Sequence, residues 1–313
     1  MIVTVTPNPS VDRTLAVGRL THGEVLRASS SWSEPSGKGV NVALALSAHG
    51  YASRAVVPVG GAEGARLETM LRARGLEYVA VPIGGEVRSN ISVLEPDGTV
   101  TKVNEPGPHL TETELKALVE AAISAGERAE WLVGCGSLPV GAGSGFYAEL
   151  VGAARHTPAR IAVDSSGAPL AAALPAGPDL IKPNADELAE AAGHAIETLG
   201  DALTAARRLR ELGAGAVLAS LGPDGAVLVE ENEVVHGEAY VADPRSTVGA
   251  GDALLAGFLA AGARGPEALR TALGWSAAAV RQPGTVLQAD GTDPTADVTL
   301  HDRVDERRRL RRS

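Results

Sequence analysis

Short apolar runs alternate with amphipathic helical patterns along most of this 313-residue chain. The apolar runs predict strands at residues 2–6, 54–59, 131–135, 160–164, 180–182 and 216–220. Helical periodicity between them predicts helices at residues 40–49, 63–74, 112–125, 146–154, 187–192 and 202–212. Because strands that alternate with helices are typical of a parallel sheet with crossover helices, the pattern predicts an α/β fold. Thr111 and Glu114 predict a capping box, and Gly50 predicts a left-handed helix end.

Two stretches, 11–33 and 86–104, show β-type alternation without a crossover helix. They predict one small antiparallel sheet, a β lid built from two insertions into a large domain that comprises residues 1–10, 34–85 and 105–313. Further along, residues 225–229 and 233–237 predict a hairpin, and two helices are expected at 250–263 and 266–281.

Composition narrows the class of fold and of partner. With 37 Gly but only 3 Trp, 4 Tyr and 2 Phe, the core must consist mostly of Val, Leu, Ile and Ala, as in sheets covered on both faces. The net charge of -10 argues against binding to nucleic acid or to an acidic membrane. A basic run, Arg307 to Arg309 with Arg311 and Arg312, indicates a solvated terminal tail.

The single cysteine, Cys135, excludes an intrachain disulfide and a Cys-rich zinc site, and it fits a cytoplasmic protein. We expect Cys135 to be a small packed residue rather than a nucleophile. No apolar segment reaches the roughly 18 residues that a membrane span needs, and the first residues lack the pattern of a leader peptide.

The most informative motif runs from Ser246 to Asp252 and enters the helix predicted at 250–263. Glycines at a helix start leave backbone N–H groups free to bind an anion, and the helix dipole adds positive potential there. Asp252 would then lie beside a bound phosphate and could take a proton from an attacking hydroxyl. The pattern also fits a tight turn in which Asp252 only offsets the helix dipole.

Two further segments carry polar side chains at helix starts. In Ser36-Gly37-Lys38-Gly39-Val40-Asn41, glycine permits close approach of a ligand, lysine adds positive charge, and asparagine can bind hydroxyls. This segment does not satisfy the P-loop pattern. Asn184 and Glu187 could support a hydrated Mg²⁺ or form a plain capping box, and the two roles are compatible.

Together these segments resemble the PfkB family of carbohydrate kinases, also called ribokinase-like, from residue 1 to about 284. Residues 36–43 are similar to the first family signature and residues 246–258 to the second, while residues 4–14 resemble the opening strand. Residues 87–91, 102–108, 135–139, 164–167 and 182–184 resemble the branch that acts on hexose phosphates. Ser36 departs from the usual glycine, but Gly37 remains.

The resemblance implies a role for each site residue. Asp252 would be the catalytic base, and Gly249, Ala250 and Gly251 would supply the anion hole. The residues implied to bind the sugar phosphate are Asn8, Asp12, Gly37, Lys38, Asn41, Arg88 and Asn90, of which Lys38 and Arg88 would hold its phosphate. Those implied to bind the nucleotide are Lys182, Asn184, Ser220, Leu221, Gly222, Gly225 and Thr247. Asn184 and Glu187 would support the metal.

The resemblance also implies an activity and a three-layer α/β/α architecture with a mostly parallel sheet. ATP and Mg²⁺ would be the cofactors, and fructose 1-phosphate would be phosphorylated on its C6 hydroxyl to give fructose 1,6-bisphosphate. Tagatose 6-phosphate, fructose 6-phosphate, an unphosphorylated sugar or nucleoside, and a non-catalytic sugar-phosphate sensor remain as alternatives. A dehydrogenase is disfavoured, because no Gly-x-Gly-x-x-Gly follows the first strand. The small sheet is expected to close over the site and to form a homodimer.

Overall fold

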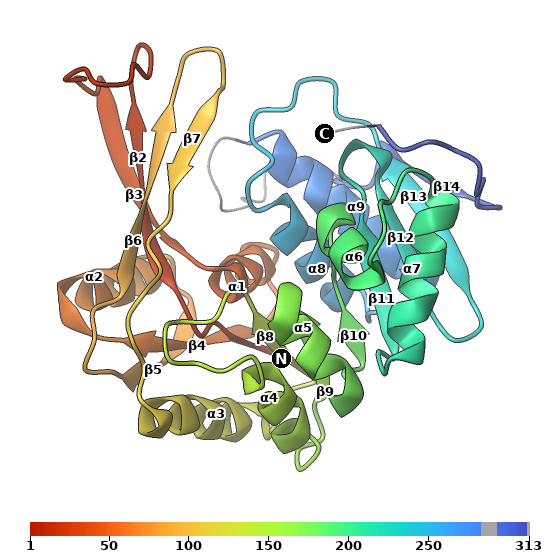
Figure 1. The fold of residues 1–313 in the computed structure, drawn as a ribbon, viewed down its shortest axis with the longest axis horizontal. Coiled ribbons are helices and arrows are strands. Elements are labelled where there is room, and N and C mark those ends of the chain that lie inside the picture. Colours follow the sequence, from red (N-terminus) through yellow and green to blue (C-terminus); the bar gives the residue numbers. More distant parts are fainter. Residues whose placement is uncertain (283–292, 312–313) are drawn as a thin grey trace.

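A ten-stranded sheet forms the centre of the molecule in the computed structural model, which describes residues 1–282 and 293–311 (Figure 1). From one edge, its parallel strands are β5 (Glu77–Pro82), β4 (Ser53–Val59), β1 (Ile2–Val5), β8 (Trp131–Cys135), β9 (Arg160–Asp164), β10 (Leu180–Ile181) and β11 (Ala216–Ser220). The antiparallel strands β12 (Ala226–Val229), β13 (Val234–Ala239) and β14 (Val298–His301) complete it.

Helices cover both faces of this sheet because its strands are apolar on both sides. In β4, Val56 packs into the core on one face, whereas Ala55 and Val57 pack into a core on the other. The first face is covered by α3 (Glu112–Gly126), α4 (Phe146–Ala154), α5 (Gly167–Ala173), α6 (Ala185–Ala192) and α7 (Leu199–Glu211). The second is covered by α1 (Lys38–Ala48), α2 (Gly61–Ala73), α8 (Ala250–Ala260) and α9 (Gly265–Val280). In the described part of the chain, no helix is both long and apolar enough to cross a bilayer.

The predicted α/β architecture is confirmed, and so are the capping box of Thr111 with Glu114 and the left-handed Gly50. Three elements were not predicted: β5, α5 and β14. Helix α5 contains Gly167 and Pro169, which are weak helix formers, and it is stabilised by packing of Leu170 and Ala173. Strand β14 pairs with β13, which lies far away in the sequence, so only the tertiary structure reveals it.

The small sheet contains β2 (Ser10–Ala16), β3 (Ser30–Ser36), β6 (Arg88–Leu94) and β7 (Val100–Val103), in the order β3-β2-β6-β7. The prediction that it is antiparallel is wrong at its centre, where β2 and β6 run parallel. The physical reason is that β2 follows β1 and β6 follows β5. Since β1 and β5 run in the same direction in the large sheet, the chain leaves both strands at the same edge of that sheet. It therefore enters β2 and β6 in the same direction.

The C-terminal basic run corrects a second prediction. Arg308 and Arg311 form ion pairs with Asp224 and Glu238 instead of lying in a solvated tail. The pattern of consecutive charges could not reveal these partners, because both acids lie far upstream. Arg307 and Arg309 are exposed, as predicted, and Arg312 lies outside the described residues.

Candidate active site

Polar residues follow the carboxyl ends of several neighbouring parallel strands. Because these ends meet at one edge of the sheet, the side chains converge there, beside the small sheet (Figure 1). The edge includes the point between β1 and β8 where the strand order changes direction, which is the usual binding position in open α/β sheets. The residues at these strand ends are Asn8, Ser137, Asp164, Lys182, Asn184 and Ser220.

The start of α8 is built to hold an anion. Its N-cap, Gly249, adopts the left-handed conformation at φ 80°, which glycine tolerates best, and no side chain caps the helix. No side chain therefore competes with a ligand for the first-turn N–H groups, although Ala250 N makes a long hydrogen bond, 3.4 Å, to the Thr247 carbonyl. The Lys182 ammonium lies close to Gly251 and adds positive charge at this helix start.

Asp252 lies in the first turn of α8 and is almost fully buried. The Asn41 side-chain amide donates a hydrogen bond to its carboxylate, Nδ2 to Oδ2, over 2.8 Å. Among the described residues no cation forms an ion pair with Asp252, so its carboxylate is free to accept a proton. Burial and the negative charge of Asp164 together raise the pKa of Asp252 to about 6, against the opposing effects of the hydrogen bond from Asn41 and of the nearby Lys38 and Lys182. A pKa in this range suits a general base near neutral pH.

Asp164 is the centre of a buried charge cluster. Its carboxylate lies 2.8 Å from Lys38 Nζ and 3.2 Å from Lys182 Nζ. Burial acts to raise the pKa of Asp164, but the two lysines outweigh it, and the pKa lies below its ordinary value. For Lys38 the balance is similar: burial acts to lower its pKa, yet Asp164 and Glu187 raise it. The cluster fixes two ammonium groups near Asp252.

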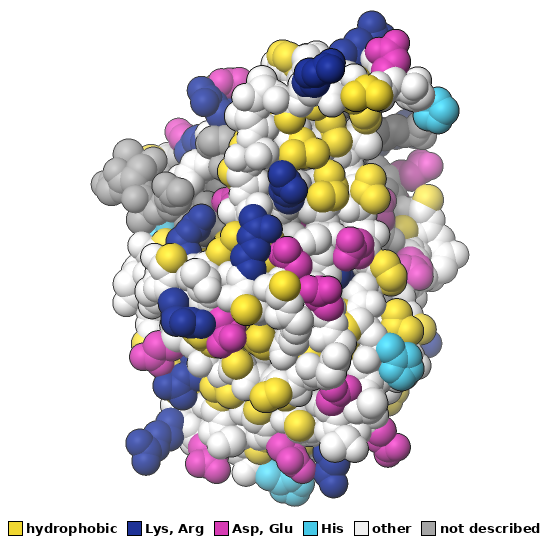
Figure 2. Space-filling model, turned by 90° about the vertical axis from the view of Figure 1, so that its left-hand side faces the viewer, with side chains coloured by type: hydrophobic (Ala, Val, Ile, Leu, Met, Phe, Trp, Pro, Cys, Tyr) yellow, Lys and Arg dark blue, Asp and Glu magenta, His cyan; other side chains and the backbone are white. Residues whose placement is uncertain are grey.

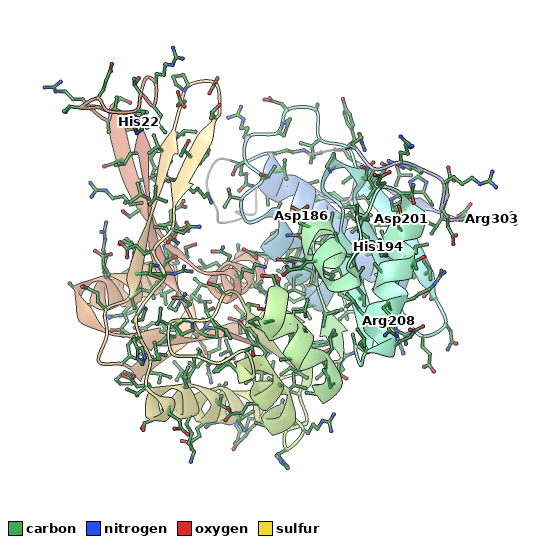
Figure 3. All side chains as sticks on the ribbon, in the orientation of Figure 1. His22, Asp186, His194, Asp201, Arg208 and Arg303 are labelled. Atoms are coloured by element: carbon green, nitrogen blue, oxygen red, sulfur yellow. The ribbon has the colours of Figure 1, made fainter. Side chains whose placement is uncertain are left out.

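Asn184 and Glu187 form the predicted capping box at the start of α6, next to Asp186, which is labelled in Figure 3. Glu187 N donates to Asn184 Oδ1 over 2.8 Å, and Asn184 N donates to Glu187 Oε2 over 2.9 Å. The other carboxylate oxygen of Glu187 lies 3.5 Å from Lys38 Nζ. Capping is therefore confirmed, and it holds two oxygen donors at the site edge.

A second cluster lies between the small and large sheets. Asp12 accepts hydrogen bonds from Ser10 Oγ (2.6 Å) and from Asn90 Nδ2 (2.9 Å). Asn8 Nδ2 donates to the Pro106 carbonyl over 3.0 Å. The structure thus places Asp12 and Asn90 on one face of the small sheet and Asn8 at the end of β1, whereas Gly37 and Asn41 lie at the start of α1.

Arg88 lies within this second cluster. Its guanidinium donates to the carbonyls of Glu105 (2.9 Å) and Asn8 (3.0 Å) and lies 3.5 Å from Ser137 Oγ. Burial lowers the pKa of Arg88, and Asp12 and Glu105 partly compensate. Lys38 lies instead in the Asp164 cluster, so the two cations predicted to hold one phosphate have different sets of partners.

Three buried polar atoms at the site have no hydrogen-bond partner among the described residues. They are Asn8 Oδ1, Asn41 Oδ1 and Arg88 Nε; a fourth, Asp164 Oδ2, has no hydrogen bond but forms the ion pair with Lys182. Buried polar groups in native proteins are nearly always paired, so unpaired ones at a site require an explanation such as a ligand. Two amide oxygens that can accept hydrogen bonds from hydroxyl groups, together with a cationic donor, suit a ligand that carries both hydroxyls and negative charge.

Of the predicted nucleotide residues, Lys182 and Asn184 follow β10, and Ser220, Leu221, Gly222 and Gly225 belong to the end of β11 and the turn to β12. Ser220 N donates to the Pro183 carbonyl over 3.0 Å, and a bridge pairs Ser220 with Asn184. Gly225 has a φ of 78° and packs so closely on Gly237 that a side chain would not fit. Leu221 is buried in the core, so its side chain supports the turn from within. Thr247 lies just before α8.

Sequence reasoning missed the role of Asp164, Ser137 and Glu105. Asp164 carries a recognisable signal, a carboxylate at the end of an otherwise apolar strand. Ser137 and Glu105 contact Arg88 or its neighbours but sit in irregular segments, where no periodicity marks them. Cys135 is fully buried in β8, and burial raises the pKa of its thiol well above the ordinary value, which confirms a packing role.

A helix-start anion hole beside a carboxylate of raised pKa, at the carboxyl edge of a three-layer α/β fold, defines the site of a phosphotransferase. The pfkB family carbohydrate kinase model matches residues 6–290, and the chain belongs to this family.

A 1-phosphofructokinase from Haloferax volcanii is 42% identical over 262 residues, which cover 83% of this chain and 84% of that protein. A crystal structure of phosphofructokinase-2 from Escherichia coli in complex with potassium superimposes with a TM-score of 0.87 at 32% identity, over 92% of this chain and 95% of that one. An Arabidopsis thaliana ribokinase shares the fold, with a TM-score of 0.73 at 22% identity over 90% of this chain and 93% of that one. The predicted ribokinase-like architecture is therefore confirmed.

Proposed function

We propose that this kinase transfers the γ-phosphoryl group of ATP to the C6 hydroxyl of fructose 1-phosphate. The observation that carries the proposal is the placement of Asp252: a buried carboxylate of raised pKa that is hydrogen-bonded to the neutral Asn41 and lies in a helix start that no side chain caps. A base next to an anion hole is the arrangement that phosphoryl transfer to a hydroxyl requires.

In the proposed mechanism, the sugar lies against Asn8, Asp12, Gly37, Asn41 and Asn90, with its C6 hydroxyl toward Asp252. Asp252 accepts the hydroxyl proton while the C6 oxygen forms a bond to the γ-phosphorus. The bond from that phosphorus to the β–γ bridging oxygen breaks, and ADP leaves with the electron pair. The amides of Gly249, Ala250 and Gly251 stabilise the charge on the transferred group, and Lys38 and Lys182 flank it.

The donor set at the start of α6 fits Mg²⁺. Within the described residues, no group of three His, Cys, Asp or Glu side chains could hold a metal by itself. Mg²⁺ is usually bound by one or two protein oxygens together with phosphates and water, which Asn184 and Glu187 could provide. When bound, it would neutralise charge on the nucleotide phosphates. Because ATP is the donor and the cysteine is a buried thiol, the proposal includes a location in the reducing cytoplasm.

The substrate assignment is supported by Arg88 and by the relatives. A half-buried guanidinium with a buried, unpaired Nε matches a phosphate better than a neutral hydroxyl. The H. volcanii relative is named 1-phosphofructokinase and is 42% identical, against 32% for the phosphofructokinase-2 structure. A coupled ADP-release assay with fructose 1-phosphate, fructose 6-phosphate, tagatose 6-phosphate and ribose tests the proposal. We expect kcat/KM to be at least about tenfold higher for fructose 1-phosphate; a preference for another sugar would refute it.

Replacing Arg88 with alanine should raise the KM for fructose 1-phosphate by roughly 100-fold and change the KM for ATP by less than about threefold. The reason is that Arg88 would contact the resident phosphate of the sugar and not the nucleotide. Steady-state kinetics in both substrates provide the measurement. Arg128→Ala, at an exposed arginine that follows α3 and lies outside the small sheet, is the matched control. Equal effects on both KM values would remove Arg88 from the sugar site.

We further propose a homodimer through the small sheet. By strand alternation, one face carries Asp12 and Asn90, and the opposite face carries Leu15, Ile91, Val93 and Val103. Figure 2 shows hydrophobic side chains gathered over the small sheet, and Val103 is 61% exposed. An apolar sheet face of this kind is typical of an interface.

Light scattering at micromolar concentration should therefore give the mass of two chains, and Val103→Glu should give a monomer. Lys102→Glu, on the opposite face of β7, should leave the dimer intact. A monomeric parent protein would contradict this part of the proposal.

A further inference from the structure

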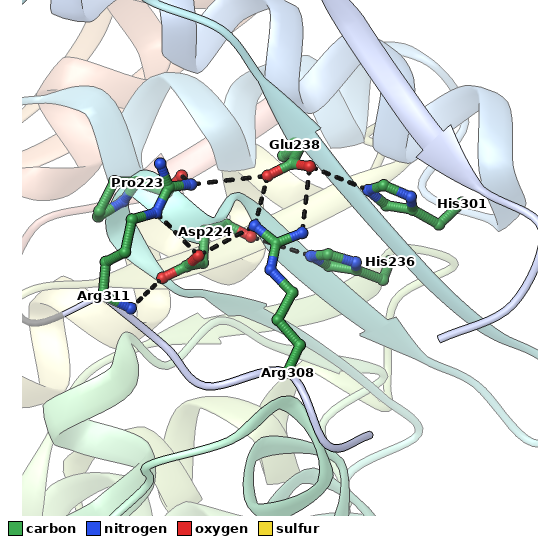
Figure 4. A network of polar contacts seen from close by, with 7 residues as sticks. All are labelled: Pro223, Asp224, His236, Glu238, His301, Arg308 and Arg311. Atoms are coloured by element: carbon green, nitrogen blue, oxygen red, sulfur yellow. Dashed lines mark hydrogen bonds and ion pairs between the residues drawn. The ribbon is translucent and has the colours of Figure 1, made fainter. Parts of the chain in front are cut away.

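The C-terminal segment contacts the turn at the proposed nucleotide site through two arginines. Arg311 donates from its backbone N to Asp224 Oδ2 (2.6 Å) and from Nε to Asp224 Oδ1 (3.1 Å), and its Nη2 donates to the Pro223 carbonyl. Arg308 Nη2 lies 3.0 Å from Asp224 Oδ1. Figure 4 shows both guanidinium groups converging on this one carboxylate. Asp224 is 1% exposed and belongs to the turn between Ser220 and Gly225.

Glu238 of β13 forms ion pairs with the same two arginines. Arg308 donates to both of its carboxylate oxygens, over 2.6 Å and 3.1 Å, a bidentate arrangement with defined geometry. These hydrogen bonds from Arg308 lower the pKa of Glu238 to about 2, so the pair stays ionised at neutral pH. His301 of β14 also contacts Glu238, at 3.2 Å, and His236 contacts the Asp224 carbonyl at 3.0 Å.

The backbone that carries the arginines is itself held in place. Leu199 N and Gly200 N, at the start of α7, donate to the carbonyls of Arg308 (3.0 Å) and Glu306 (2.9 Å). Leu310 N donates to the Glu197 carbonyl, and the Leu310 side chain packs on the large core. Further upstream the same segment runs along the outer edge of the molecule at Arg303 (Figure 3). Arg308 and Arg311 are therefore presented from a rigid base.

Arg308 and Arg311 contact the turn at residues 220–225, and the position of this turn determines where a nucleotide would contact the protein. Asp224 N donates to the Leu221 carbonyl, Gly225 N donates to Gly222, and Ser220 is bridged to Asn184. A shift of Asp224 would therefore move the backbone of Gly222 and Ser220. We infer that Arg308 and Arg311 form a C-terminal clasp that sets the position of this turn and so determines the affinity for ATP, as positioning residues that do not touch the reacting atoms. The inference rests on the proposed nucleotide site.

Kinetics of Arg308→Ala and Arg311→Ala test the clasp. Each should raise the KM for ATP by roughly five- to tenfold, while the KM for fructose 1-phosphate and kcat change by less than about twofold. Arg308→Lys keeps the charge but loses the bidentate contact with Glu238. Its KM for ATP should therefore lie between that of the parent protein and that of Arg308→Ala. This variant also keeps the test valid if Arg308→Ala does not fold.

Arg309→Ala is the matched control, because Arg309 is exposed in the same segment and carries the same charge. Its KM for ATP should equal that of the parent. An unchanged KM for ATP in both clasp variants, even with a lowered melting temperature, would overturn the inference, since the arginines would then be structural only. An equal increase in Arg309→Ala would also overturn it, because the effect would then be one of net charge.

Calorimetric titration with ATP separates this inference from the proposed function. If the parent protein phosphorylates none of the sugars but binds ATP, the proposed activity fails, and weaker ATP binding by the clasp variants still supports the clasp. If the parent protein phosphorylates fructose 1-phosphate and the clasp variants bind ATP normally, only the clasp fails. If the parent protein does not bind ATP, the clasp fails together with the nucleotide site.

Discussion

Replacing Asp252 with asparagine should lower kcat by at least about 100-fold while the protein remains folded. The amide cannot accept the hydroxyl proton, but it has the same shape and can keep a hydrogen bond with Asn41. Steady-state ADP release and thermal unfolding provide the two measurements. Asp186→Asn is the matched control, because Asp186 is exposed in the first turn of α6 and should keep full activity. Near-normal turnover of Asp252→Asn would refute its role as the base.

The pH dependence of the parent protein provides a second test of the same carboxylate. Burial raises the pKa of Asp252 to about 6, so the unprotonated base forms as the pH rises through 6 and is lost as it falls below. The profile of kcat/KM should therefore have an acid limb with an apparent pKa near 6. A limb near the ordinary aspartate value of about 4 would show that another group limits the rate.

Removing Asp164 should lower the free energy of unfolding by about 3–5 kcal/mol, the largest loss of stability that we expect from a site variant. In Asp164→Ala, the ammonium of Lys182, whose side chain is 4% exposed, would be left buried without its partner. Urea unfolding provides the measurement.

Glu187→Gln is the control for the charge cluster. It removes a 3.5 Å contact to Lys38, which keeps Asp164 at 2.8 Å, so the expected loss is below about 1 kcal/mol. If Asp164→Ala were no less stable than Glu187→Gln, the buried cluster would be unimportant to the fold.

Local rules were sufficient wherever the deciding residues are close in sequence. The strands β8, β9 and β11 and helix α4 begin and end at the predicted residues, because apolar runs and helical periodicity are local patterns. The capping box of Asn184 with Glu187 is likewise a matter of three-residue spacing. The charge pattern failed at Arg308 and Arg311, whose partners Asp224 and Glu238 lie in other elements.

The amino-acid sequence by itself determined the α/β class, the two signature segments and the candidate base, because these depend on periodicity and on side chains at fixed spacing. Only the tertiary structure decided the parallel pairing of β2 with β6, the grouping of Lys38 and Lys182 around Asp164, and the contact of the C-terminal arginines with the nucleotide turn. Each of these joins residues that are far apart along the chain. Whether such groups meet depends on how strands order and helices pack, and burial then sets their charge and pKa.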